Sequence, residues 1–172
     1  MGETDLAALL ASLAPRVRPG RFTLVPLPDP PSLGEGIEAL IREEEATTAV
    51  VAVSTARARG WPIAFQAAWI TLGAQSDPAA VGLTAAISQA LAAEGIACNV
   101  LAAFHHDHLL VPADRLPDAL RCLRHLSARH ARSRLAAPTD PPGQSPEPPG
   151  PAATAPPGEG SRDEAGANRG VT

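Results

Sequence analysis

The sequence predicts an α+β protein whose ordered part is built from two related halves. Residues 21–64 show the pattern of a strand, a loop, two strands and a helix. Residues 65–131 show a strand, a helix, two strands and a second helix. The strands are indicated by short apolar runs rich in β-branched residues, and the helices by apolar residues three or four positions apart. The two halves share too little sequence identity to establish a repeat by themselves.

A short helical segment is predicted ahead of the first half, within residues 1–20. Thr4 or Asp5 can cap this helix, because a side-chain oxygen accepts hydrogen bonds from the unpaired N–H groups at a helix start. One side of the helix is apolar and carries Leu6, Leu9, Leu10 and Leu13. We expect Pro15 and Pro19-Gly20 to break the chain before the first strand.

The first half, residues 21–64, is expected to begin with a strand at Phe22–Leu27. An irregular loop follows at Pro28–Pro31, because proline lacks the N–H group that regular structure needs. Ile37–Arg42 fits a helix or a strand equally well by periodicity alone. Thr47–Val53 has the β-branched composition of a strand, and a short helix over 54–59 leads to the second half.

The second half, residues 65–131, has the clearest signals for where helices and strands begin and end. Trp69, Ile70 and Leu72 predict a buried strand. Asp77-Pro78 predicts a helix start, with a capping carboxylate and then proline at the first helical position. The remaining expectations are apolar helix positions at Val81, Thr84, Ile87 and Leu91, a helix stop at Gly95, strands over 96–103 and 108–111, and a last helix over 114–130.

Composition restricts the environment and the partners. The chain of 172 residues has a net charge of −4, so no basic surface indicates binding to nucleic acid. The N-terminus has no continuous apolar stretch and no run approaches 18 apolar residues, so we expect neither a secretory signal nor a membrane span. Cys98 and Cys122 lie in apolar settings, as free thiols do in a reducing compartment. A cytoplasmic protein is expected.

The C-terminal stretch, residues 132–172, is predicted to be a disordered tail. It contains nine of the 19 prolines, and from Pro138 onward Val171 is its only aliphatic residue larger than alanine. Such a segment cannot bury enough apolar surface to offset the entropy cost of ordering.

Three stretches resemble the small tandem ACT-domain proteins. They are REEE at residues 42–45, AVGLTAAISQALAAEGIACNV at 80–100 and HDHLLVP at 106–112, within a similar region that runs from Asp5 to Leu126. The resemblance implies two ferredoxin-like modules of βαββαβ type packed together, the first lacking a full first helix. It also implies that Ile37–Arg42 is a strand, joined through Glu43–Glu45 to the next one. ACT domains are regulatory modules, many of which sense amino acids.

The resemblance places a ligand site at the turn between the Trp69 strand and the following helix, residues 73–82. Backbone N–H groups at a helix N-terminus favour a carboxylate, and we expect the donors of this turn to be unoccupied. The residues implied as ligand-binding are Gln75, Ser76, Asp77, Val81, Gly82 and, on the adjacent strand, Asn99. The alternative is that Asp77 is only a helix cap and Gly82 only a packing glycine.

The run His105-His106-Asp107-His108 looks like a metal site at first sight. Strand alternation puts His106 and His108 on one face, but a zinc site needs three or four ligands. A polar turn explains the run without a metal, so neither a metal nor a cofactor is predicted. The sequence also contains no G-x-S-x-G elbow and no phosphate-binding glycine loop, and so gives no case for an enzyme.

The sequence therefore predicts a regulatory sensor of a small molecule, and the expected ligand is an amino acid; no catalytic activity of its own is expected. Exposed edges of small sheets favour pairing, so a homodimer is expected, and regulation would act through an unidentified protein partner or through oligomeric state. Two alternatives stay open. One is a metal-binding protein or enzyme that uses residues 105–108, and the other is a structural interaction module without a ligand.

Overall fold

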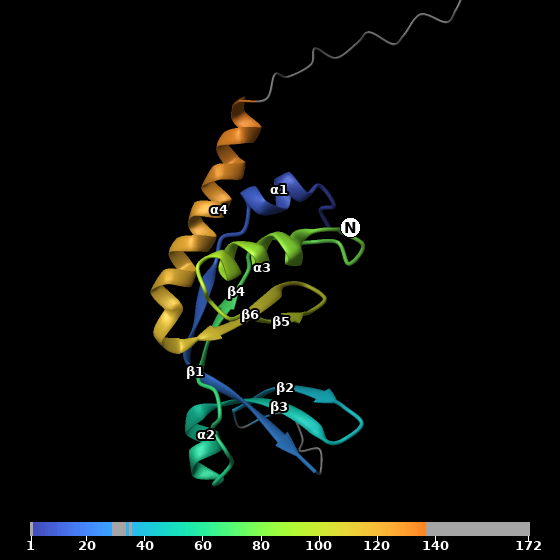
Figure 1. Cartoon of the computed structure of the whole chain (residues 1–172). Coiled ribbons are helices and arrows are strands. Elements are labelled where there is room, and N and C mark those ends of the chain that lie inside the picture. Colours follow the sequence, from blue (N-terminus) through green and yellow to red (C-terminus); the bar gives the residue numbers. More distant parts are fainter. Residues whose placement is uncertain (1, 29–33, 35, 137–172) are drawn as a thin grey trace, which may run out of the picture. The chain divides into compact units, whose positions relative to one another are not determined.

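The computed structural model describes residues 2–28, 34 and 36–136, which form one antiparallel sheet with helices packed on it (Figure 1). The six strands lie in the order β2-β3-β1-β4-β6-β5. The elements are α1 (Leu6–Ala11), β1 (Arg16–Leu27), β2 (Ile37–Arg42), β3 (Thr47–Ala52), α2 (Val53–Ala58), β4 (Ala67–Thr71), α3 (Leu83–Ala93), β5 (Asn99–Ala102), β6 (Asp107–Pro112), the 3-10 turn η1 (Ala113–Arg115) and α4 (Leu116–Ala136). The α+β prediction is confirmed, and Ile37–Arg42 is a strand.

Strand β1 is twice as long as predicted and belongs to both halves. It begins at Arg16 and runs through Pro19-Gly20, which the sequence analysis treated as a break. The pairing with β4 shifts register between Arg18 and Phe22, and Gly20 has a φ of 102°. A bulge of this kind tolerates a proline without an N–H group and bends the strand. Its first residues pair with β4 and its last six with β3.

The pairing of β1 with β4 gives each half its fourth strand. Next to β4, β6 and β5, the first part of β1 completes the sheet of the second half. Strand β4 likewise completes the sheet of the first half, beside β1, β3 and β2. The two halves are therefore joined by a shared central pair of strands.

Helix α3 begins later than predicted, and the expected cap is wrong. It starts at Leu83, and its N-cap is Gly82, in the left-handed conformation with φ 96°. The Asp77 carboxylate instead accepts a hydrogen bond from the Ala79 N–H at 3.0 Å, which makes a local turn. Val81, predicted on the apolar stripe, is 83% exposed. The stop at Gly95 is confirmed, since α3 ends at Ala93 with Glu94 as its C-cap and Gly95 has a φ of 64°.

The other boundaries differ by a few residues. Strand β5 is shorter than the predicted 96–103, and Ile96, just after the helix turn, packs in the core ahead of the strand. Helix α4 extends to Ala136, so residues 132–136 are helical and not part of a disordered tail. The rest of that tail, 137–172, and most of the predicted loop Pro28–Pro31 lie outside the described residues.

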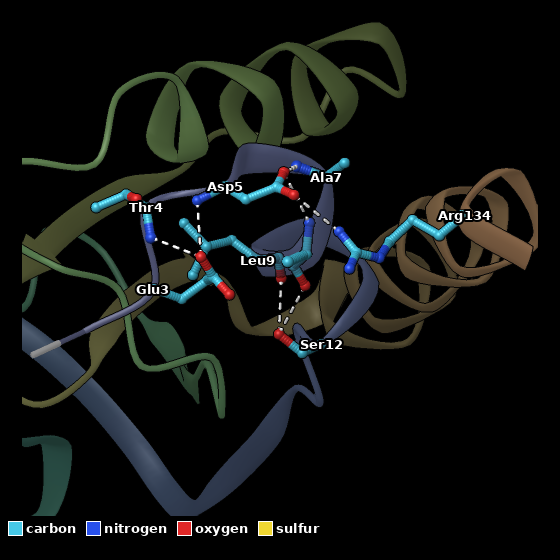
Figure 2. A network of polar contacts seen from close by, with 8 residues as sticks. Glu3, Thr4, Asp5, Ala7, Leu9, Ser12 and Arg134 are labelled. Carbon is cyan, nitrogen blue, oxygen red and sulfur yellow. Dashed lines mark hydrogen bonds and ion pairs between the residues drawn. The ribbon is translucent and has the colours of Figure 1, made fainter. Parts of the chain in front are cut away.

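Helix α1 is capped as predicted, by Asp5, and packs into the second half. The Asp5 carboxylate accepts hydrogen bonds from the N–H groups of Ala7 at 2.8 Å and Ala8 at 3.3 Å, and Arg134 of α4 donates to it at 3.0 Å (Figure 2). The buried side of α1 faces α4 and α3. The buried leucines are Leu9, Leu10 and Leu13. The N-terminal segment thus belongs to the helix layer of the second half.

Three apolar clusters hold the fold together. The largest lies between the sheet of the second half and helices α1, α3 and α4. A smaller one lies between α2 and strands β1 to β3, at the other end of the sheet from α3 (Figure 1). The third lies on the opposite face of the sheet and joins both halves through Phe22, Val50, Ala67, Trp69 and Leu110. Among the described helices, none is long and apolar enough to cross a membrane.

Candidate functional site

The turn after β4 and the turn between β5 and β6 enclose a pocket of about 400 Å³. The β4–α3 side contributes a polar loop and the first turn of α3, and the β5–β6 side contributes small residues, an aromatic ring and a carboxylate. The lining residues are Ser76, Asp77, Pro78, Ala80, Leu83, Thr84, Ala102, Ala103, Phe104 and Asp107. This volume lies within the range of pockets that bind small molecules, about 300–1,000 Å³.

The N-terminal segment fixes the loop that forms one wall. Glu3 pairs with Ser76 in a parallel bridge, its N–H donating to the Gln75 carbonyl oxygen at 3.0 Å. The Asp77 N–H donates in turn to the Glu3 carbonyl oxygen at 2.9 Å. A Cβ atom on Gly2 would lie 2.4 Å from the Asp77 nitrogen, so only glycine fits there. Figure 2 shows how the Glu3 carboxylate accepts hydrogen bonds from the N–H groups of Thr4 and Asp5 and orders this segment.

These contacts correct the expectation of an unoccupied set of backbone donors. The N–H of Asp77 is used by Glu3, and the N–H of Gly73 donates to the Leu13 carbonyl oxygen at 2.8 Å. The Ala79 and Ala80 N–H groups bond to the side chain and carbonyl of Asp77. The turn itself is therefore satisfied internally over these residues.

The first turn of α3 is different. Helix geometry leaves its N–H groups without partners inside the helix, and Gly82 has no side chain with which to cap them. Leu83 and Thr84 of this turn line the pocket. The partial positive charge of a helix N-terminus therefore lies at the pocket and favours an anionic group there.

Two carboxylates form the polar wall. Asp77 uses one oxygen for the Ala79 N–H, and Asp107 accepts a hydrogen bond from the Ser76 hydroxyl at 3.5 Å. The Asp107 carbonyl oxygen also accepts from the Leu72 N–H at 2.9 Å, which ties β6 to the end of β4. Beside them, Phe104 is 81% exposed and offers an aromatic surface at the pocket. The pocket lining thus combines a helix N-terminus, two carboxylates and an exposed aromatic ring.

The structure brings together some of the residues implied by the sequence and separates others. Ser76 and Asp77 line the pocket, and Gln75 lines an adjoining hollow of about 260 Å³ with Gly2 and His105. Among the remaining three, Val81 faces solvent, Gly82 lies against Leu6 of α1, and Asn99 pairs with Leu110 at the other end of β5, outside the pocket lining. A ligand role for all six remains a prediction.

Three pocket residues with polar or aromatic side chains are not among the site residues that the sequence implies. Asp107 and Phe104 belong to the β5–β6 turn, and Thr84 was read only as a helix position. The polar run 105–108 contains Asp107, but the sequence pattern alone suggests a metal site there and does not indicate this pocket. Only the pairing of β4 with β6 brings that turn beside residues 76–78.

Within the histidine run, His108 has a structural role. The Nδ1 atom of His108 lies 3.1 Å from the Thr71 hydroxyl, and its ring is 5.2 Å from the Trp69 ring, centroid to centroid. Partial burial lowers the pKa of His108, and the neighbouring charge of His106 lowers it further; Asp107 acts in the opposite direction, and Arg18 adds the smallest lowering effect. Across residues 2–28, 34 and 36–136, no three His, Cys, Asp or Glu side chains are grouped to hold a metal ion.

Both cysteines are free thiols held in the protonated form. Burial raises the pKa of Cys98 to about 11. Burial, with the nearby Glu94 carboxylate, also raises the pKa of Cys122, whose thiol lies 3.3 Å from the Ala90 carbonyl oxygen. Because the thiolate is the nucleophilic form, these environments oppose covalent catalysis by either cysteine.

Comparisons with known proteins agree with this architecture. Two family models described as ACT domain match the chain, over residues 1–68 and 65–125. A protein of unknown function from Vibrio cholerae is 32% identical in sequence, with a TM-score of 0.63, and the match covers 72% of this chain and 97% of that one. No curated protein matched the sequence.

Two more distant structures show the same fold. The regulatory subunit of aspartate kinase from Thermus thermophilus is 13% identical, with a TM-score of 0.51, over 67% of this chain and 98% of that one. Aspartate kinase from Clostridium acetobutylicum is 10% identical, with a TM-score of 0.52, over 66% of this chain and 34% of that one. The family matches support a regulatory role in binding a small molecule. The chain belongs to the ACT-domain family, as two ACT domains in tandem.

Proposed function

We propose that the chain binds a free amino acid in the pocket between the β4–α3 and β5–β6 turns and acts as a regulatory sensor without catalysis of its own. One observation supports this most directly: the uncapped N-terminus of α3 and the carboxylates of Asp77 and Asp107 line the same pocket of about 400 Å³. A free amino acid carries a negative carboxylate and a positive ammonium group on one carbon atom. A helix N-terminus and a carboxylate in the same pocket can each bind one of these two groups.

The proposed pose follows from charge. The ligand carboxylate accepts hydrogen bonds from the N–H groups at the first turn of α3, near Leu83 and Thr84. The ammonium group lies against Asp107 and the free oxygen of Asp77, since charge-assisted hydrogen bonds are the strongest available there. The side chain of the ligand packs on Phe104, whose ring is otherwise exposed. An apolar or aromatic amino acid fits this third wall best.

Regulation would depend on the segments that form the two walls of the pocket, which are connected to α1 and to the β5–β6 hairpin. The loop wall is held by Glu3, which lies two residues before the N-cap of α1, and the other wall ends the β5–β6 hairpin. A ligand that favours one arrangement of these segments shifts its population by the difference in binding free energy. The outer strands β2 and β5 leave sheet edges for a homodimer or for a protein partner in the cytoplasm.

A thermal-shift screen of the twenty amino acids with the full chain tests the proposal. A ligand present at 100 times its dissociation constant stabilises the folded state by about 2.7 kcal/mol, enough to raise the melting temperature measurably. Asp107→Asn should abolish the shift, because it removes a charge that faces the ammonium group. Glu44→Gln, an exposed carboxylate in the β2–β3 turn, should leave it unchanged.

The proposal fails if no amino acid shifts the melting temperature of the wild-type chain. That result would favour the second candidate, an interaction module without a ligand, which the internal use of the Gly73 and Asp77 N–H groups makes a reasonable alternative. A shift that survives Asp107→Asn would place the ligand elsewhere on the molecule.

A further inference from the structure

A second cavity lies on the helix layer, in the groove between α1, α3 and α4. Its volume is about 510 Å³, and it shares no lining residue with the pocket at the β4–α3 turn. The floor is apolar and consists of Leu6, Leu10, Ala86, Ala90 and Leu126. The groove is large enough for a small-molecule ligand.

Helix α3 explains why the groove stays open. Its long apolar side chains, Leu83, Ile87 and Leu91, are buried toward the sheet. The positions that face α1 and α4 are Ala86 and Ala90, whose short side chains leave the space between the helices unfilled. A larger residue at either position would fill the groove from below.

Three contacts between helices hold the walls in place. The Ser127 hydroxyl of α4 donates to the Ala11 carbonyl oxygen of α1 at 2.8 Å, and Arg134 pairs with Asp5 at 3.0 Å. The Cys122 thiol contacts the Ala90 carbonyl oxygen of α3 at 3.3 Å. The groove is therefore formed before any ligand arrives, which reduces the entropy cost of binding.

The polar wall of the groove carries positive charge at one end. Arg129 lines it, with His125 and His130 on the same helix. Within the part of the chain that the structure describes, the Arg129 guanidinium has no ion-pair partner, unlike Arg115, Arg121 and Arg134. The one carboxylate of the lining, Glu94, follows the last residue of α3, whereas Arg129 lies beside α1 in the second half of α4. An apolar floor that ends at an unpaired guanidinium suits an elongated apolar molecule with a terminal carboxylate.

We propose that this groove is a second ligand site, for an apolar carboxylic acid of the size of decanoate. The aliphatic chain lies along the alanines of α3 and the leucines of α1, and the carboxylate accepts hydrogen bonds from Arg129. Arginine binds a carboxylate through two parallel N–H groups, so the charge also sets the direction of the ligand. The site is independent of the amino-acid pocket, because the two have different walls.

Isothermal titration calorimetry of the full chain with decanoate tests the site. Decanoate is expected to bind saturably with one site per chain, and decanol and decylamine at least about tenfold more weakly, because only the carboxylate can pair with Arg129. Arg129→Gln should weaken decanoate binding by about tenfold. The matched control Arg132→Gln, an exposed arginine on the same helix outside the groove, should not change it.

A second variant tests the floor. Ala90→Leu fills the groove and should abolish binding of decanoate while the thermal transition remains cooperative, so that loss of binding is separated from loss of fold. The proposal is overturned if decanoate does not bind saturably. This would be the result if a second copy of the chain covered the groove. It is also overturned if decanol binds as tightly as decanoate, or if Arg129→Gln and Ala90→Leu both bind decanoate with the same affinity as the wild type. None of these results bears on the amino-acid screen, which probes a different pocket.

Discussion

The two ACT domains of this chain share a sheet but differ in how much helix covers it. In the second, an 11-residue α3 and a 21-residue α4 are joined by α1 from the N-terminus, and sixteen residues are buried beneath them. In the first, the described helix is the six-residue α2, over a cluster of six buried residues. Both cavities considered above lie in the second domain. The long helices of the second domain thus bury the larger apolar cluster and line both cavities, while the first domain mainly completes the sheet.

The largest effect on stability is expected from leucine-to-alanine substitutions, one in the core of each domain. Leu123→Ala in the core beneath α4 should cost about 4 kcal/mol of unfolding free energy, because a fully enclosed leucine leaves a cavity that cannot collapse. Leu27→Ala, in the small cluster at the end of β1, should cost about 2 kcal/mol, since its surroundings can relax or admit water. Equilibrium urea unfolding measures both. Equal losses would mean that the small cluster is packed as tightly as the large one.

A smaller effect is expected at the glycines that end or begin helices. Gly60 after α2 and Gly95 after α3 both have positive φ and open space where a Cβ would lie, so alanine should cost about 1 kcal/mol at each. Gly82→Ala should cost about 2 kcal/mol, because its Cβ would also lie 3.0 Å from a methyl carbon of Leu6. Thermal unfolding of the three variants provides the comparison. If Gly82→Ala is no worse than Gly60→Ala, then α1 moves freely on α3 and does not belong firmly to the second domain.

The strand that joins the domains affects the titration of His108. Burial is the main cause that lowers the pKa of His108 in β6, and the charge of His106 comes second. Arg18 of β1, which lies over the Trp69 ring and pairs with Glu38 of β2, adds a smaller effect in the same direction. The folded pKa of His108 is lowered from 6.5, so its neutral form stabilises the fold above that value, and this contribution is lost as pH falls through the folded pKa.

Histidine NMR resonances measure this titration. The midpoint of His108 should lie below 6.5 in the wild type, and His106→Asn should raise it, since a neighbouring positive charge is removed. The control His130→Asn changes a histidine of α4 outside this cluster and should leave the midpoint unchanged. A midpoint that stays the same in His106→Asn would mean that the His106 charge does not contribute to the lowered pKa.

Local signals in the sequence predicted most of the elements. The β-branched composition of Thr47–Val53 predicted β3 to within one residue, and the leucine spacing of α4 predicted a helix from near its start. The stop at Gly95 and the cap at Asp5 were also predicted, because a positive φ and a helix N-cap depend on neighbours in the chain. Such features need no knowledge of tertiary contacts.

What the sequence did not predict depends on partners far along the chain. Asp77-Pro78 is a good helix start on local grounds, but Glu3 takes the Asp77 N–H, and the space beside Gly82 is filled by Leu6 of α1. Likewise Pro19-Gly20 looks like a break until β4 is placed beside β1. The candidate pocket was predicted on its β4–α3 side only, because Asp107 and Phe104 reach it through strand pairing.

The smallest expected effect concerns the attachment of the N-terminal segment to the second domain at low pH. The backbone N–H groups of Ala8 and Ala7 hold the pKa of Asp5 below its usual value, and Arg134 lowers it further (Figure 2). Because the folded pKa is lowered, the stabilising contribution is complete above the unfolded pKa near 3.8 and is lost as pH falls through the folded value. Asp5→Asn keeps a capping oxygen but removes the titrating charge, so the melting temperature should fall less between pH 7 and pH 3 than in the wild type.

Arg134→Gln should flatten the same pH dependence by a smaller amount, because the two N–H groups remain, whereas Arg132→Gln should not alter it. If Asp5→Asn and the wild type lose the same number of degrees, then this carboxylate does not link α1 to α4 in solution, and the N-terminal segment is held by Glu3 and the buried leucines alone.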